Sequence, residues 1–211
     1  MLISTKNTLI FAFAALIAAS QNSFSQSFSE GTHYSIIEKP SSTSKDKKTD
    51  SPSVVEYFSF SCPGCYAVEP SMKALIKRQP AANVKRIHMP FGGQKAKYSQ
   101  KVFVAMTMLK ANEHKDAIFS RIHVNRNLFN SDKEIVDFFT DLGYEKTEVE
   151  QTVNSFASDS MIRKMNKAAA AQKIVSVPTI IVNGKYQINV RALANANTLT
   201  LLVNHLHGLD G

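Results

Sequence analysis

A cysteine pair lies between a predicted strand and a predicted helix, and this limits the folds that the chain can adopt. Residues 53–60 (SVVEYFSF) are rich in β-branched and aromatic side chains, which predicts a strand inside a sheet. The tetrapeptide Cys62-Pro63-Gly64-Cys65 follows, and residues 63–79 have the pattern of a helix. Pro63 suits the first helical turn, where its missing N–H needs no partner. This arrangement predicts dithiol redox chemistry on an α/β fold.

The cysteines are better explained by reactivity than by structure. Cys62 and Cys65 are the only two cysteines among 211 residues. A disulfide between them closes a loop of four residues, which constrains the unfolded chain little. At a helix N-terminus the free N–H groups and the helix dipole favour a thiolate, so we expect a lowered pKa for Cys62. Cys65, one turn further on, is expected to be buried and to act as the resolving thiol.

Metal binding is the main alternative for the pair. A zinc site needs about four ligands, and the chain has no second cysteine pair. Its histidines are scattered, which is more typical of surface or core residues. Two thiolates can hold Cu(I), so a copper-binding carrier remains an alternative. We expect no metal and no bound cofactor at the site.

The first 25 residues have the order of parts found in a secretory signal. Lys6 supplies a positive charge, and the run of apolar residues 9–19 is too short to span a bilayer. Small residues follow, and cleavage is expected near Ser25-Gln26. The prediction is export to an oxidising compartment, where disulfides persist.

Strand character returns twice after the first helix. Residues 83–89 alternate well enough to be a second strand, and residues 179–182 and 185–189 flank Asn183-Gly184, a strong hairpin signal. A last helix is expected over residues 195–207. Between these strands the sequence has helical periodicity, with helices expected at 147–156 and 161–172. The order predicts one α/β domain interrupted by a helical insertion.

The dipeptide Val177-Pro178 lies just before the predicted hairpin. Proline is tolerated as the first residue of a strand, and this is the purely structural interpretation. The functional interpretation is a cis peptide bond that places a bare backbone edge beside Cys62. The cysteine motif upstream favours the functional interpretation.

These motifs together resemble the DsbA family of bacterial periplasmic disulfide oxidases. The resemblance extends over the whole chain after the predicted signal. It implies a thioredoxin fold with an inserted all-helical domain: residues 26–93 and 166–211 form the thioredoxin-like part, and residues 94–165 form the insertion. The matching segments are Ile37-Glu38-Lys39-Pro40, Glu56-Tyr57-Phe58-Ser59-Phe60, Cys62-Pro63-x-Cys65-Tyr66, Phe91-Gly92-Gly93, Asn154-Ser155-Phe156, Lys167-Ala168-Ala169-Ala170, and Val177-Pro178 with residues 182–187.

The resemblance also implies roles for individual residues. Cys62 corresponds to the nucleophilic cysteine and Cys65 to its resolving partner, while Val177 and Pro178 correspond to the loop that holds the substrate backbone. Pro63 and Gly64 would tune the dithiol. Glu56, Glu69 and Arg86 correspond to a charged cluster beneath the family's active site, although lysine is more usual than arginine at the last position. Such a cluster can tune pKa values, or it can be a simple ion-pair network.

The same resemblance implies a monomer that gives its disulfide to reduced exported proteins. A DsbB-type quinone-linked membrane partner would reoxidise it, although residues 190–201, part of the family's docking groove, are more polar here. A reductase or isomerase is an alternative, against which stands the lack of a separate dimerisation domain. Nucleic acid is not expected as a partner.

Two departures from the family bear on function. Gly64 stands where the family usually has histidine, which can stabilise the Cys62 thiolate, so we expect a Cys62 pKa above the family's very low value and a milder oxidant. The net charge of +8 is the second departure. It fits an ordinary basic surface or a face that selects acidic or unfolded substrates.

Overall fold

The computed structural model describes residues 27–37, 50–91, 93 and 96–210. The predicted signal (1–25), and with it the expected cleavage site near Ser25-Gln26, lies outside the described residues. Within them the chain forms a five-stranded mixed sheet in the order β1-β5-β4-β2-β3. β2 and β3 run parallel, and the other neighbouring strands are antiparallel. The strands are β1 (Tyr34–Ile36), β2 (Ser53–Phe58), β3 (Asn83–His88), β4 (Thr179–Val182) and β5 (Tyr186–Ile188).

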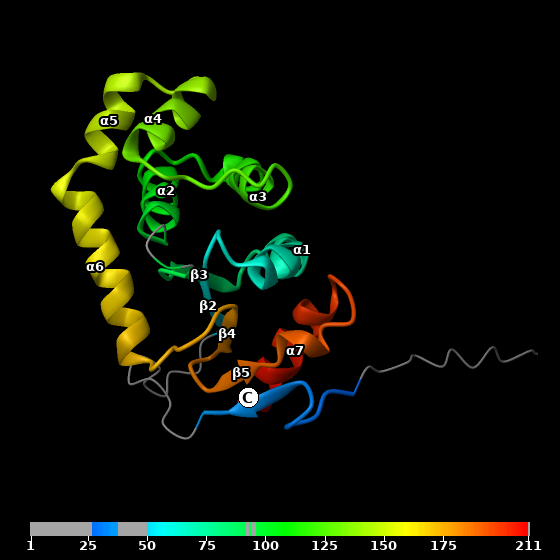
Figure 1. Ribbon diagram of the computed structural model, residues 1–211. Coiled ribbons are helices and arrows are strands. Elements are labelled where there is room, and N and C mark those ends of the chain that lie inside the picture. The colour runs from blue at the N-terminus through cyan, green and yellow to red at the C-terminus, as the bar shows by residue number, and fades with distance from the viewer. Residues whose placement is uncertain (1–26, 38–49, 92, 94–95, 211) are drawn as a thin grey trace, which may run out of the picture.

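The helices fall into two groups in space (Figure 1). α1 and α7 lie beside the sheet, whereas α2, α3, α4 and α5 form the inserted group, and the long α6 returns from that group to the sheet. This arrangement is the predicted thioredoxin fold with a helical insertion. The helices are α1 (Pro63–Arg78), α2 (Ala96–Met108), α3 (Lys115–His123), α4 (Asp132–Asp141), α5 (Lys146–Val153), α6 (Phe156–Ala171) and α7 (Thr198–Leu209), with short 3-10 turns η2 (Asn112–His114) and η3 (Val190–Ala192).

The sequence prediction was wrong at the start of α6. The sequence predicts helices at 147–156 and 161–172, whereas α5 ends at Val153 and α6 already begins at Phe156. Ser155 is its N-cap, and the Ser155 hydroxyl accepts the N–H of Ser158 at 3.0 Å. Serine and aspartate are favoured at a cap and in a first turn, although they disfavour a helix interior. The expected domain boundary after residue 165 therefore falls inside one continuous helix.

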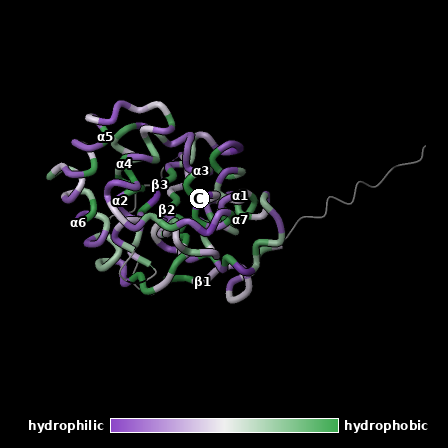
Figure 2. Tube along the Cα trace, turned by 45° about the horizontal axis from the view of Figure 1, so that its top comes forward, coloured by the Kyte–Doolittle hydropathy of each residue, from purple (hydrophilic) through white to green (hydrophobic). Residues whose placement is uncertain are grey.

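Alternate residues of the central strands face two separate hydrophobic clusters. Val54 and Val182 pack with α1 and α7, in a cluster that includes Leu75 and Leu202. Ile181 belongs instead to the cluster that extends through the insertion. Figure 2 shows hydrophobic and hydrophilic residues alternating along the Cα trace of both parts. Because the second cluster also includes both cysteines, the insertion and the active-site end of the sheet share one core.

The predicted hairpin between β4 and β5 is confirmed. Asn183 and Gly184 both have positive φ, 51° and 66°, as the tight turn requires.

Among the described residues, no helix is both long and apolar enough to cross a bilayer.

Candidate active site

Cys62 caps the N-terminus of α1. Its backbone is extended, its sulfur accepts the N–H of Cys65 at 3.4 Å, and Pro63 occupies the first turn as predicted. Both cysteines are free thiols. The exposed fraction is 4% for Cys62 and 0% for Cys65, so Cys62 is the less buried of the two.

The pKa values of the two thiols are displaced in opposite directions. The pKa of Cys62 is lowered to about 6, first because the Cys65 side chain donates a hydrogen bond to its sulfur and also because the backbone N–H groups of Cys65 and Gly64 donate to it. The same side-chain hydrogen bond and burial raise the pKa of Cys65. At neutral pH the pair therefore holds one thiolate, on Cys62, and one thiol. The predicted lowering at Cys62 is confirmed.

The loop at Val177-Pro178 lies against the dithiol. The Val177–Pro178 peptide bond is cis, as the functional interpretation of the sequence predicted. The Cys62 sulfur lies 3.5 Å from the carbonyl oxygen of Val177. Gly64 allows a close approach, because a Cβ atom at this position would lie 3.2 Å from Cδ of Pro178 and 3.7 Å from the Cys62 sulfur.

The structure brings together the charged residues that the resemblance singled out. Arg86 on β3 places its Nε 2.5 Å from Oε2 of Glu56 and its Nη2 2.7 Å from Oε2 of Glu69. The side chains of Glu56 and Glu69 are 0% and 5% exposed. Burial raises the pKa of Glu56, and Arg86 opposes this effect. The charge of Glu56 contributes in turn to the raised pKa of Cys65.

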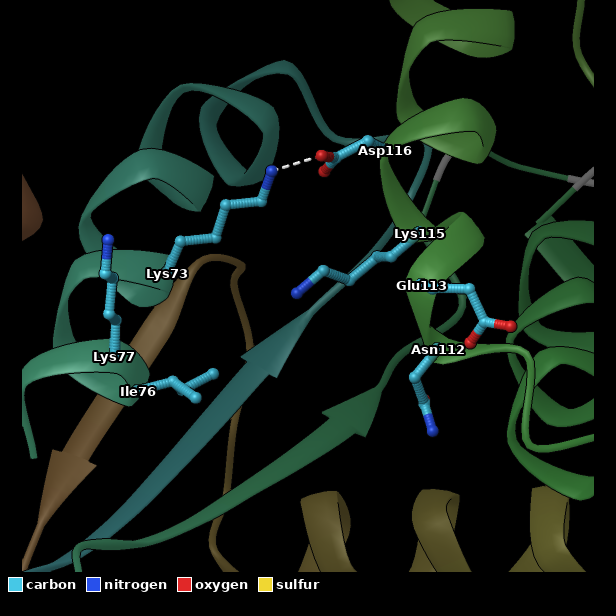
Figure 3. A pocket seen from close by; sticks show the side chains of 7 residues that line it. All are labelled: Lys73, Ile76, Lys77, Asn112, Glu113, Lys115 and Asp116. Carbon is cyan, nitrogen blue, oxygen red and sulfur yellow. Dashed lines mark hydrogen bonds and ion pairs between the residues drawn. The ribbon is translucent and has the colours of Figure 1, made fainter. Parts of the chain in front are cut away.

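Lys115 is a fourth member of this cluster, which sequence reasoning missed. It is the first residue of α3, and its ammonium group forms an ion pair with Glu69 on α1. Figure 3 shows Lys115 extending from α3 toward α1, beside a second ion pair between Lys73 and Asp116. Lys73, Lys115 and Asp116 line a cavity of about 310 Å³ between α1 and α3, and neither cysteine lines this cavity. No local pattern marks Lys115, because its role depends on how the insertion packs on α1.

Two histidines near the dithiol were also missed, having been regarded as scattered. Nε2 of His88 accepts the backbone N–H of Phe60 at 2.9 Å, and the ring is fully buried. Nε2 of His123, the last residue of α3, donates to the carbonyl oxygen of Phe60 at 2.7 Å. His123 also stacks on Tyr66, with ring centroids 4.8 Å apart and planes 5° apart. Their spacing in the sequence gives no signal that they meet.

A resident metal has no evident ligand set at this site. Within the part of the chain that the structure describes, no three residues among histidine, cysteine, aspartate and glutamate are placed to hold a metal ion together. The dithiol itself offers one thiolate and one buried thiol whose pKa is raised. The arrangement is therefore suited to thiol–disulfide exchange, in which one reactive and one protected sulfur are needed.

Comparison with known proteins agrees with this chemistry. Residues 53–207 match the model of the DSBA-like thioredoxin domain. The thiol:disulfide interchange protein DsbA of Escherichia coli K12 is 31% identical over 192 residues, covering 88% of each chain. The DsbA of Pseudomonas aeruginosa is 28% identical over 201 residues, covering 94% of this chain and 92% of the relative. Its crystal structure superposes with a TM-score of 0.72 at 27% identity, covering 87% of this chain and 94% of that one. The chain described here belongs to the family of DSBA-like thioredoxin domain proteins.

Proposed function

We propose that this protein is a thiol:disulfide oxidoreductase that donates the Cys62–Cys65 disulfide to reduced exported proteins. The observation that carries the proposal is the geometry of the pair: Cys62 caps the N-terminus of α1, where its sulfur accepts the N–H of Cys65 at 3.4 Å, while Cys65 is fully buried. This geometry lowers the pKa of Cys62 and raises that of Cys65. A stabilised Cys62 thiolate favours the reduced form of the pair. The disulfide is then a stronger oxidant, because a couple whose reduced form is stabilised accepts electrons more readily.

The reaction proceeds by two exchange steps. A substrate thiolate attacks the Cys62 sulfur of the disulfide, a substrate–Cys62 bond forms, and the Cys62–Cys65 bond breaks. Cys65 leaves and takes up a proton, as its raised pKa requires. A second substrate thiolate then attacks the substrate sulfur and expels Cys62 as a thiolate, a good leaving group because its pKa is low. Two electrons pass from the substrate dithiol to the enzyme, and the substrate gains a disulfide.

The neighbouring residues support these steps in different ways. Val177 and Pro178 present backbone beside the Cys62 sulfur, where an extended substrate segment can lie. Pro63 and Gly64 shape the N-terminus of α1, whose N–H groups stabilise the thiolate. Glu56, Glu69 and Arg86 lie beneath the dithiol and tune the thiol pKa values, because the charge of Glu56 raises the pKa of Cys65.

The place of action and the partners follow from the family and from the predicted signal. We assign the protein to the periplasm as a monomer, after cleavage near Ser25-Gln26. A DsbB-type membrane quinone reductase would take the two electrons from the reduced dithiol and restore the disulfide. A copper-binding carrier is disfavoured, because Cu(I) would need both sulfurs as thiolates while Cys65 is buried and its pKa is raised.

The test uses the oxidised protein and a reduced peptide that contains two cysteines. We expect the protein to lose its disulfide and the peptide to gain one in equal amounts. A C65S variant, incubated with a peptide carrying an activated disulfide, should stop at a stable mixed disulfide on Cys62. A C62S variant serves as the matched control and should form none. Lack of transfer by the wild-type protein would refute the proposal.

A further inference from the structure

The peptide groups of Phe60 are held by two histidines from different parts of the fold. β2 ends at Phe58, whose carbonyl oxygen accepts the last ladder hydrogen bond, from Met89 at 2.7 Å. Phe60 therefore lies beyond the sheet, and its buried main-chain groups need other partners. His88, the last residue of β3, accepts its N–H, and His123, the last residue of α3, donates to its carbonyl oxygen. The first contact comes from the sheet and the second from the helical insertion.

The two contacts require different protonation of the imidazoles. Nε2 of His88 accepts a hydrogen bond, so this nitrogen is unprotonated. Burial lowers the pKa of His88 to about 3, which keeps the ring neutral at the pH of function. Nε2 of His123 faces a carbonyl oxygen and must carry a proton, as it does in the corresponding neutral tautomer. Neither contact needs an imidazolium ion.

Phe60 is joined directly to the groups that shape the dithiol. It lies within the turn from Ser59 to Cys62, which is closed by a hydrogen bond from the Cys62 N–H to the Ser59 carbonyl oxygen at 3.1 Å. The N–H of Ser59 lies 3.5 Å from the Cys65 sulfur. The position of the Phe60 peptide therefore sets how the chain enters α1 and where the Cys62 sulfur lies relative to the N–H groups of that helix.

His123 contacts the chain on both sides of the cysteine pair. Its N–H fixes Phe60, two residues before Cys62, and its ring stacks on Tyr66, the residue after Cys65. At the other end of α3, Lys115 forms an ion pair with Glu69 on α1. Both ends of α3 therefore contact the active-site segment. His123 contacts residues that flank the cysteine pair, whereas Lys115 contacts Glu69, four residues after Cys65.

We propose that His123 is a positioning residue that holds the Ser59–Cys62 turn, and with it the Cys62 sulfur, at the N-terminus of α1. The insertion thereby contributes to the reactivity of a dithiol that it does not carry. The proposal deepens the proposed function, since it concerns the thiol to which that function assigns the exchange. It predicts that the donor N–H of His123, rather than its flat ring, controls the Cys62 thiolate.

Two variants separate the donor from the ring. H123F keeps a flat ring against Tyr66 but has no N–H, whereas H123Q keeps an N–H donor and loses the ring. We expect H123F to raise the pKa of Cys62 by about half to one unit, a roughly three- to tenfold loss in the thiolate equilibrium. H123Q should stay within about 0.3 units of the wild type. The measurement is thiolate absorbance near 240 nm across pH, on the full-length reduced protein.

H114Q is the matched control, because His114 precedes α3 and contacts Glu113 and Tyr144 rather than the active-site turn. It should leave the pKa of Cys62 unchanged. H123A supplies a second variant without a donor, and circular dichroism verifies that each variant is folded. An unchanged pKa in folded H123F or H123A would overturn the proposal, and so would equal shifts in H123F and H123Q.

This measurement does not depend on substrate turnover. If H123F shifts the pKa while the wild-type protein fails to oxidise a peptide, the positioning role stands and the proposed function fails. If the peptide is oxidised and the pKa of H123F is unchanged, the proposed function stands and the positioning role fails.

Discussion

Replacing Gly64 with histidine places an imidazole beside the reactive sulfur. A Cβ atom at position 64 would lie 3.7 Å from the Cys62 sulfur, so the ring can come within about 4 Å of it. At that separation an imidazolium and a thiolate attract by about 1 kcal/mol in bulk water and about 4 kcal/mol near a protein surface. Since one pKa unit corresponds to about 1.4 kcal/mol, G64H should lower the pKa of Cys62 by roughly one to three units. Each tenfold gain for the reduced form raises the reduction potential by about 30 mV, so the expected rise is about 30 to 90 mV.

G64A is the control for the added side chain itself. Its Cβ meets Cδ of Pro178 at 3.2 Å, so the loop must shift slightly in both variants, but only G64H adds an imidazole. The assay equilibrates each protein with mixtures of reduced and oxidised glutathione and measures the reduced fraction. G64A should stay within about 15 mV of the wild type. If G64H were no more oxidising than G64A, position 64 would not determine the strength of this oxidant.

Ionised groups at and near the dithiol should also affect folding stability. Between pH 6 and 8 the reduced protein should gain about 1 kcal/mol of unfolding free energy per pH unit relative to the oxidised protein, because the lowered Cys62 pKa leaves the folded state with up to one proton fewer than the unfolded state. This contribution is lost as the pH falls through about 6, and C62S should show no such slope in urea unfolding. R86M should cost about 3–5 kcal/mol, since it leaves Glu56 buried without its ion-pair partner and Glu69 with Lys115 alone, and E56Q should cost clearly less; equal losses would contradict this. K115M should destabilise by about 1.5–3 kcal/mol, because Glu69 is buried, whereas K73M breaks an exposed pair and should cost less than about 1 kcal/mol.

The fold and the dithiol were predictable because their signals are local in the sequence. The residues that predict the strand before Cys62 and Pro63 are adjacent in the sequence, and so are those that predict the turn at Asn183-Gly184. The cis bond before Pro178 was an expectation based on a single dipeptide and its pairing with the cysteine motif, and the structure confirms it. The start of α6 was misjudged, because serines that weaken a helix interior serve as cap and first turn there.

The residues that support the dithiol from a distance were not predictable in this way. Lys115, His88 and His123 reach the site through the packing of the insertion and the pairing of β3, and their contacts join residues 28 to 63 positions apart. Only Glu56, Glu69 and Arg86 could be named in advance, since family resemblance aligned them. Spacing alone predicts contacts within one helix or strand, but it carries no information on which elements pack together.

The equilibrium reduction potential of the wild-type Cys62–Cys65 couple tests the proposed disulfide donor most directly. DsbA has a cysteine pKa of about 3.5 and a potential of about −120 mV. At pH 7 a pKa of about 6 stabilises the thiolate form roughly 300-fold less. At about 30 mV per tenfold change, we expect a potential of about −190 mV against glutathione. A value at or below about −270 mV, the potential of thioredoxin, would identify a reductant and contradict the proposed donor. A value near −120 mV would instead contradict the role assigned to Gly64.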